Sequence, residues 1–303
     1  MTGKRRLLYI LAPSFSGSTL LTYLLGHHEE ISTIGELKAT KMGDVREYRC
    51  SCGEPILECG FWQAVQGRAR ERGLEFSVER FNTVFRGDNP VANKLVQATV
   101  RPPALEVARR MALSVVPGAA SAVRRIAAHN RALADIVCEL QGGAIFLDGS
   151  KDSVRLLHLL DSDLWEVQVI YLQRDGRGVT NSIRSHRNVS FAKAMEIWRE
   201  WVTELERMRR RLDGAAVFDL QYEALCRAPV ETLARLWEWL GVEPMPVSEN
   251  FRDGDFHILG NSMRLSNATE IRLDERWRTA LSAEDFAAFE RRNGALNREL
   301  GYE

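Results

Sequence analysis

The chain has 303 residues, of which 45% are hydrophobic and 27% are charged, enough apolar material to bury a substantial core. Lysine plus arginine and aspartate plus glutamate both number 41, so no overall charge indicates a nucleic-acid or membrane partner. Any anion site must therefore be local. We expect one α/β domain over residues 1–303.

The first residues superficially resemble a signal peptide, because a basic stub precedes the apolar run at residues 7–12. This run is short and leads directly into the polar loop at residues 13–19, so it is better interpreted as a buried strand. No other segment approaches the roughly 20 apolar residues of a membrane span. We therefore expect a cytoplasmic protein.

Four short apolar runs are typical of buried parallel strands. They lie at residues 7–11, 144–147, 167–172 and 216–220. Each is followed by a polar or glycine-containing turn and then a helical pattern. This alternation predicts a P-loop-like, doubly wound parallel sheet flanked by helices, and the ligands of such sheets bind at the carboxyl ends of the strands.

Helical periodicity is clear in four places. Helices are predicted from Ser18 to a stop at Gly26, over residues 191–212, over residues 230–240, and after a capping box at residues 282–285. The tryptophans in these helical stripes, including Trp198 and Trp201, are expected to belong to the core, because periodicity alone explains their spacing.

Residues from about 39 to about 141 fit the alternation poorly. This stretch is rich in arginine and in helix-forming residues, and it is interrupted at Pro102-Pro103 and Pro117-Gly118. We interpret it as a mainly helical insertion, or lid, that shapes the site of the second substrate.

The loop after the first strand, at residues 12–19, has the layout of a phosphate-binding loop, in which backbone amides and a helix amino terminus surround an anion. The nucleotide-triphosphatase version carries a lysine where this chain has Ser18. Because that lysine contacts the β- and γ-phosphates, its absence weakens a kinase or ATPase interpretation. The plainer alternative is a serine-rich turn in which Ser18 or Thr19 caps the helix.

Several segments, in the right order along the chain, resemble the sulfotransferase superfamily, especially bacterial enzymes related to the carbohydrate and tyrosylprotein sulfotransferases. The matching segments are residues 16–20, 28–37, 147–152, 169–182, 220–225 and 260–264. The resemblance implies that the donor is 3′-phosphoadenosine 5′-phosphosulfate (PAPS) and that a sulfonate group passes to an acceptor hydroxyl.

The resemblance also implies roles for individual residues. Glu36 matches the catalytic carboxylate and Lys151 a lysine near the sulfonate. The residues expected to bind the nucleotide are Ser14, Ser16, Gly17, Ser18, Thr19, Leu20, Arg174, Ser182, Tyr222, Asn261, Ser262 and Arg264. Independently of the family, Arg174 ends an apolar strand, where its guanidinium can make paired charge-assisted bonds to a phosphate.

One departure concerns Phe15, because related enzymes carry a lysine or arginine at that position. That cation offsets charge on the bridging oxygen as the bond breaks, and Lys151 is our candidate to replace it. No metal is expected to be required, since the group in transit is less anionic than a phosphoryl group.

Plainer alternatives stand beside these assignments. Glu36 is alternatively a helix-starting or surface glutamate, Lys151 a surface lysine, and the Arg174 segment a solvated basic turn. A P-loop kinase and a non-catalytic nucleotide-binding protein remain as rival functions. For the acceptor, a sugar, a lipid-linked alcohol, a natural product and a tyrosyl group are all open.

The five cysteines form an odd set in a chain without a secretion signal, which argues against a disulfide scaffold. Cys50, Cys52 and Cys59 invite a zinc interpretation, but their spacing differs from paired Cys-x2-Cys knuckles, and a fourth ligand such as His27 or His28 would have to be supplied. Similar cysteine-glycine segments occur in bacterial members of the superfamily. A structured turn is therefore the preferred interpretation.

Overall fold

A five-stranded sheet forms the centre of the computed structural model, which describes residues 3–39 and 42–303. The strands are β1 (Arg5–Leu11), β2 (Ile31–Thr33), β3 (Ile145–Asp148), β4 (Trp165–Gln173) and β5 (Val217–Gln221). Their order is β2-β3-β1-β4-β5, and every neighbouring pair is parallel. The doubly wound α/β fold expected from the sequence is confirmed.

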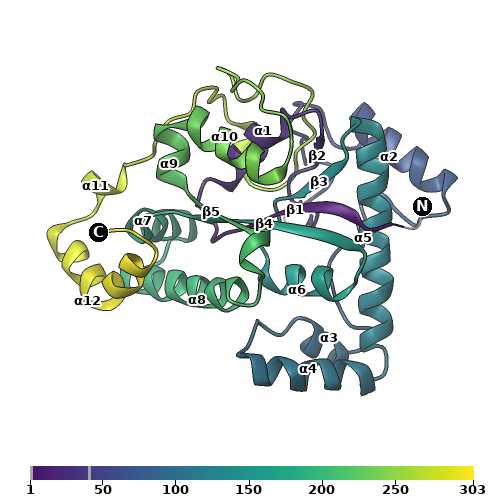
Figure 1. Cartoon of the computed structure of the whole chain (residues 1–303), viewed down its shortest axis with the longest axis horizontal. Coiled ribbons are helices and arrows are strands. Elements are labelled where there is room, and N and C mark those ends of the chain that lie inside the picture. Colours follow the sequence, from purple (N-terminus) through teal and green to yellow (C-terminus); the bar gives the residue numbers. More distant parts are fainter. Residues whose placement is uncertain (1–2, 40–41) are drawn as a thin grey trace.

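Helices cover both faces of this sheet (Figure 1). They are α1 (Ser18–Gly26), α2 (Gly60–Glu71), α3 (Pro90–Val96), α4 (Pro103–Val115), α5 (Ala119–Gln141), α6 (Ser153–Asp161), α7 (Gly176–Arg187), α8 (Phe191–Arg209), α9 (Tyr222–Arg227), α10 (Pro229–Leu240), α11 (Trp277–Ala280) and α12 (Ala283–Glu299), with 3-10 turns η1 (Gly214–Ala216) and η2 (Ser262–Leu265).

The two faces of β1 bury alternate side chains, as the period of a strand requires. Leu7 and Tyr9 pack with residues of α5, α6 and α8, whereas Leu8 and Ile10 pack with residues of α1, α9 and α10. All four side chains are almost completely buried, so β1 is continuously apolar because it is covered on both faces.

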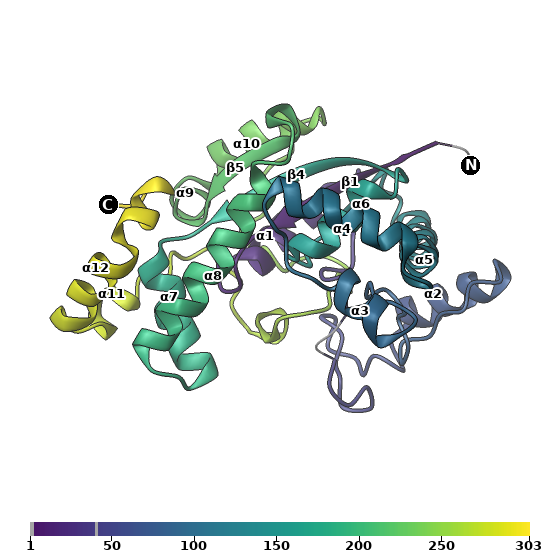
Figure 2. The ribbon, with the colours of Figure 1, turned by 90° about the horizontal axis from the view of Figure 1, so that it is seen from below.

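The segment between β2 and β3 is mainly helical, as predicted, and contains α2 to α5. Helix α5 packs on α2 and on strands β2 and β3, while α3 and α4 lie at the periphery (Figures 1 and 2). The stretch predicted as an insertion includes residues 40–41, which lie outside the described residues. Its role as a lid stays a prediction.

The four predicted strands agree with the structure to within two residues at each end, and the predicted helices are present. The capping box is confirmed too: the Ser282 hydroxyl accepts a bond from the Asp285 amide, and the Asp285 carboxylate accepts one from the Ser282 amide. Strand β2 was missed, because its three residues are too few to produce an apolar run.

Strand order reverses about β1, since β3 and β2 lie on one side of it and β4 and β5 on the other. In open sheets of this kind the crevice outside the carboxyl ends of the strands, at the reversal, is the usual ligand site. The loops that follow β1 and β4 are therefore where chemistry is expected. Across the described part of the chain, no helix combines the length and the apolar character that spanning a membrane would require.

Candidate active site

The loop after β1 turns sharply into α1 at Gly17. This glycine caps the helix with a φ of 83°, and its carbonyl accepts the first helical bond, from the Leu21 amide. A Cβ placed on Gly17 would lie 2.4 Å from Cδ2 of Tyr222. The position therefore requires glycine twice over, for the left-handed backbone and for the close approach of an aromatic ring.

A cavity of about 410 Å³ opens beside this loop. Eleven of the residues predicted from the sequence line it: Ser14, Gly17, Ser18, Thr19, Leu20, Glu36, Lys151, Arg174, Ser182, Tyr222 and Asn261. They come from segments spread over most of the chain, and the fold brings them to one place. We call this space the donor cavity.

Arg174 lies directly after β4 and is held firmly in the wall of the donor cavity. Its Nη1 donates to the Phe15 carbonyl at 2.8 Å, its Nη2 donates to the Asp274 carbonyl at 2.8 Å, and its guanidinium lies 4.7 Å from the centre of the Tyr222 ring. Its Nε is buried and has no hydrogen-bond partner within the described ranges. The guanidinium is thus fixed in place in the cavity wall, where Nη2 also forms an ion pair with Asp274 Oδ2 at 3.2 Å.

Tyr222 joins the phosphate-loop side of the donor cavity to the segment before α11. Its hydroxyl accepts a bond from the Asp274 amide at 3.1 Å and donates to the Arg272 carbonyl at 3.3 Å. Asp274 in turn is an ionised carboxylate, because hydrogen bonds from Arg276, together with the charge of Arg174, hold its pKa well below the usual range.

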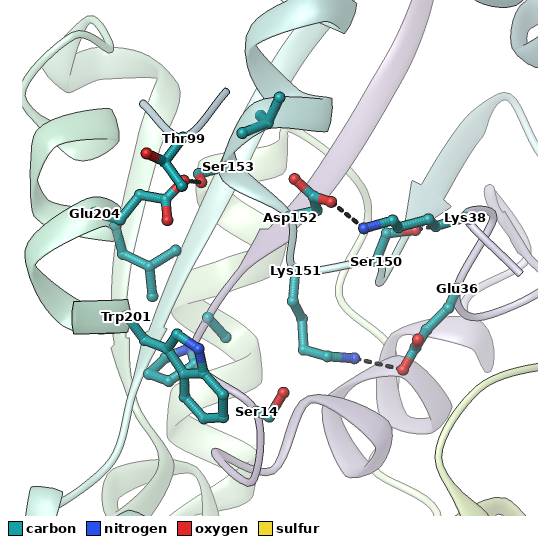
Figure 3. Close-up of a pocket in the computed structure, with 14 residues that line it drawn as sticks. Ser14, Glu36, Lys38, Thr99, Ser150, Lys151, Asp152, Ser153, Trp201 and Glu204 are labelled. Carbon is teal, nitrogen blue, oxygen red and sulfur yellow. Dashed lines mark hydrogen bonds and ion pairs between the residues drawn. The ribbon is translucent and has the colours of Figure 1, made fainter. Parts of the chain in front are cut away.

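Glu36 and Lys151 both line the donor cavity, and Figure 3 shows the contact between their charged groups. The Lys151 ammonium donates to Glu36 Oε1 at 2.6 Å and to the Gly149 carbonyl at 3.0 Å, and both charged side chains are only 14% exposed. Lys151 and Phe15 have positive φ angles of 63° and 69°. Such backbone conformations are uncommon outside glycine and concentrate at functional sites.

Asp148, at the end of β3, builds the turn that carries Lys151. One carboxylate oxygen accepts bonds from the amides of Leu37 and Ser150, and the other accepts a bond from Arg155 Nε at 2.8 Å. The Asp148 and Arg155 side chains are almost fully buried. This buried ion pair therefore fixes the segments of Glu36 and Lys151 relative to each other.

A second cavity, of about 350 Å³, is also lined by the Glu36–Lys151 pair (Figure 3). It shares Ser14, Glu36 and Lys151 with the donor cavity. The remaining wall is contributed by Ala12, Pro13, Lys38, Thr99, Ser150, Asp152, Ser153, Val154, Trp201, Glu204 and Leu205. We call this space the acceptor cavity.

Charge and one aromatic ring shape the acceptor cavity. Burial acts to raise the pKa of Asp152, but the ion-paired Lys38 ammonium outweighs it and lowers that pKa below its usual value. Trp198 is fully buried as predicted, whereas Trp201 packs against the core but is only partly buried and also lines the cavity. The apolar face of α8 therefore contributes side chains to both the core and the acceptor cavity.

Three residues predicted to bind the nucleotide do not line the donor cavity. Ser16 is fully buried, and its hydroxyl is without a partner in the part of the chain that is described. Ser262 begins η2, and the Arg264 guanidinium lies 4.2 Å from the Tyr48 ring centre and donates to the Arg49 and Gly260 carbonyls. Their part in binding stays a prediction.

Sequence reasoning missed one whole wall of the donor cavity. Met263 of η2 lines it, together with Ser266, Ala268, Glu270, Arg272, Asp274 and Arg276 from the segment between η2 and α11. This segment has no helical or strand periodicity, so no pattern singled it out. Its alternating acidic and basic residues were the available signal.

Residues 77–246, more than half of the chain, match the model of the sulfotransferase family. Among proteins with curated descriptions, none matches the sequence. The family match begins within the stretch predicted as an insertion and ends beyond α10.

Two solved structures share the fold over the full length of the chain. The sulfotransferase domain from the Synechococcus PCC 7002 olefin synthase has a TM-score of 0.51 and 18% identity, covering 100% of this chain and 97% of that one. The sulfotransferase domain from the curacin biosynthetic pathway has a TM-score of 0.51 and 14% identity, covering 100% and 99%. At such low sequence identity, these structural similarities support the assignment of the fold alone.

Proposed function

Because the chain belongs to the sulfotransferase family, we propose that it transfers a sulfonate group from PAPS to a hydroxyl group of a second substrate. The observation that carries this proposal is the meeting of two cavities at Ser14, Glu36 and Lys151. A donor on one side of this junction and an acceptor on the other would have their reacting atoms between a carboxylate and an ammonium group. Such placement converts a bimolecular step into an effectively unimolecular one.

The donor cavity suits a nucleotide with phosphate groups at both ends. The amides and hydroxyls of residues 14–19, at the amino terminus of α1, would surround the 5′-phosphosulfate. Arg174, with its guanidinium already oriented, and Ser182 on α7 would hold the 3′-phosphate. Tyr222, packed over Gly17, fixes one end of the nucleotide site relative to the other.

In the proposed reaction, Glu36 accepts the proton of the acceptor hydroxyl while the hydroxyl oxygen attacks sulfur. An oxygen–sulfur bond forms as the bond between sulfur and the bridging oxygen of the 5′-phosphate breaks. The electron pair of the broken bond stays on that phosphate oxygen, and adenosine 3′,5′-bisphosphate leaves. Lys151, which lines the same cavity as Phe15, stabilises the developing negative charge in place of the cation that position 15 lacks.

The acceptor cavity favours a substrate that combines an apolar ring or chain with polar groups. The partly exposed Trp201 ring offers an apolar surface, while the Lys38–Asp152 pair and Ser153 offer charged and hydroxyl groups. This mixture suits a hydroxylated small molecule, sugar or lipid-like alcohol.

Thermal-shift measurements test the proposal against its rivals. Adenosine 3′,5′-bisphosphate without magnesium should raise Tm in a dose-dependent way by mass action, and ATP with magnesium should have a much smaller effect. The opposite order of the two nucleotides would favour a kinase. A screen of hydroxylated metabolites with isotopically labelled PAPS then separates an enzyme from a protein that only binds the nucleotide, because only an enzyme yields a labelled sulfonated product.

A further inference from the structure

Four potential metal ligands gather away from the two cavities just described. Cys50, Cys52 and Cys59 come from the turn between β2 and α2, and His257 comes from the loop between α10 and η2, about 200 residues later in the chain. Their ligand atoms all lie within 4.8 Å of one another. His27 and His28 do not join them, because their ring nitrogens contact the carbonyls of Phe251 and Glu243.

Three of the distances within this group match those of a tetrahedral zinc centre, and the other ligand atoms lie within 4.8 Å of one another. Zinc–sulfur bonds of about 2.3 Å and zinc–nitrogen bonds of about 2.0–2.1 Å place tetrahedral ligand sulfurs about 3.7–3.8 Å apart and sulfur and nitrogen about 3.5–3.6 Å apart. The Cys52 and Cys59 sulfurs are 3.7 Å apart, and Nδ1 of His257 lies 3.6 Å from the Cys50 sulfur and 3.4 Å from the Cys59 sulfur.

The surroundings of His257 also fit a metal ligand. Its Nε2 lies 2.9 Å from Asp255 Oδ1, so the proton of a neutral ring resides on Nε2 and the Nδ1 lone pair faces the three sulfurs. The Phe61 ring stacks on the imidazole at 4.4 Å with an interplanar angle of 2°, which fixes the ring orientation. A carboxylate behind a ligating histidine is the common arrangement in zinc sites.

We propose that Cys50, Cys52, Cys59 and His257 form a structural zinc site. Three thiolates and one imidazole are a donor set that selects zinc over magnesium or calcium, and four protein ligands leave no open position for substrate or water. The site is therefore structural, and no step of sulfonate transfer passes through it. The local backbone supports it: Gly53, at φ 93°, reverses the chain after Cys52, and the Gly53 amide donates to the Cys50 carbonyl.

The zinc site would anchor a loop that closes the candidate active site. The segment around Cys50 is already bonded to the loop of His257, because the Ser51 hydroxyl donates to the Phe256 carbonyl at 2.6 Å and accepts from the Ile258 amide at 2.7 Å. Two residues further on, Gly260 packs so closely on Glu36 that a Cβ there would lie 2.6 Å from its carboxyl carbon, and Asn261 lines the donor cavity.

A disulfide is the competing use of these thiols, since the Cys52 and Cys59 sulfurs are close enough to approach each other. It would leave Cys50 and His257 without a common partner. A metal ion, in contrast, accounts for both the buried Cys50 thiol and the oriented imidazole.

Metal analysis of the purified full-length chain tests the proposal. After expression in zinc-containing medium and extensive dialysis under reducing conditions, mass spectrometry should find one zinc ion per chain. Cobalt(II) substituted for zinc should give the intense visible absorption of a tetrahedral site, with sulfur-to-metal charge-transfer bands. Zinc removal by a strong chelator should lower Tm, since binding free energy contributes to folding. All of these readouts are independent of catalytic activity.

Matched variants locate the metal. His257→Ala and Cys59→Ser should lose stoichiometric zinc, whereas Cys138→Ser, which changes a buried thiol on α5 outside the group, should retain it. If either loss variant fails to fold, His257→Cys decides the matter, because it should keep one zinc and shift the cobalt spectrum to that of four thiolates. Asp255→Asn should weaken zinc binding about 10- to 100-fold.

Two results would overturn the proposal. One is a wild-type chain that holds less than stoichiometric zinc even after reconstitution with zinc under reducing conditions. The other is a Cys52–Cys59 disulfide in the native protein, detected by mass spectrometry of peptides from protein alkylated before any reduction.

Discussion

The Lys151 ammonium lies 2.6 Å from Oε1 of Glu36, at the one place where the donor and acceptor cavities share their walls. The two residues are 115 positions apart and belong to loops that follow adjacent strands of the sheet. The ion pair therefore links the Glu36 carboxylate, the proposed base for the hydroxyl proton, with the Lys151 ammonium, which is proposed to stabilise the leaving phosphate.

Glu36→Gln should lower kcat about 100- to 10,000-fold, the usual contribution of a positioned general base. The amide keeps the shape of the side chain but cannot accept the hydroxyl proton at neutral pH. Affinity for adenosine 3′,5′-bisphosphate should change little, because the base acts on the acceptor. Steady-state kinetics with labelled PAPS and calorimetry with the bisphosphate measure the two quantities. Near-normal turnover in this variant would eliminate Glu36 as the base.

Lys151→Met should lower kcat about 100- to 1,000-fold, the range found when one donor to a developing oxyanion is removed. The matched control is Lys193→Met, which removes an exposed lysine paired with Glu196 on α8. Single-turnover rates at saturating donor separate this effect from weaker binding. Equal rates for the two variants would mean that Lys151 does not replace the missing loop cation.

Arg174→Ala should weaken binding of adenosine 3′,5′-bisphosphate at least about tenfold, since a hydrogen bond to a charged group contributes roughly 1.5–3 kcal/mol. Arg209→Ala is the control, because Arg209 pairs with Asp219 and neither residue lines the donor cavity. Calorimetric titration of each variant gives the affinities. An unchanged Kd for Arg174→Ala would reject its role at the 3′-phosphate.

Much of this fold follows from the sequence because the buried strands and the stripes of α8 and α10 are long and regular. The short β2 is held by its backbone bonds to β3 and has too few residues to stand out. The phosphate-loop residues and Lys151 could be found because they follow predicted strands, whereas Glu36, which follows the missed β2, could be found only through the family resemblance. The cavity wall from residues 263–276 could not, because it is irregular, and neither could His257, whose partners lie some 200 residues earlier.

Gly17→Ala should destabilise the fold and weaken nucleotide binding. A left-handed backbone costs a non-glycine residue about 1–2 kcal/mol, and here the added methyl group would also collide with the Tyr222 ring. Gly142→Ala is the matched control, because Gly142 has a φ of 87° but open space around it. Denaturant unfolding should show a larger loss of stability for Gly17→Ala than for Gly142→Ala. Nucleotide titration should show a loss of affinity for Gly17→Ala only. Equal effects on both measurements would contradict the close packing of Tyr222.

Asp148→Asn should cost about 3–5 kcal/mol in the free energy of unfolding, because it leaves the Arg155 guanidinium buried without its counter-ion. The exposed Arg209–Asp219 pair provides the comparison, and Asp219→Asn should cost less than about 1 kcal/mol. Urea denaturation followed by circular dichroism measures both. A cost at Asp148 no larger than that at Asp219 would show that the ion pair does not set the geometry of the Lys151 turn.

The most direct test of the proposed function is a crystal structure of the chain with adenosine 3′,5′-bisphosphate. We predict the 5′-phosphate against the amides of residues 14–19, and the 3′-phosphate within hydrogen-bond distance of Arg174 and Ser182. A nucleotide bound elsewhere, or in the donor cavity with its two phosphates exchanged, would contradict the account.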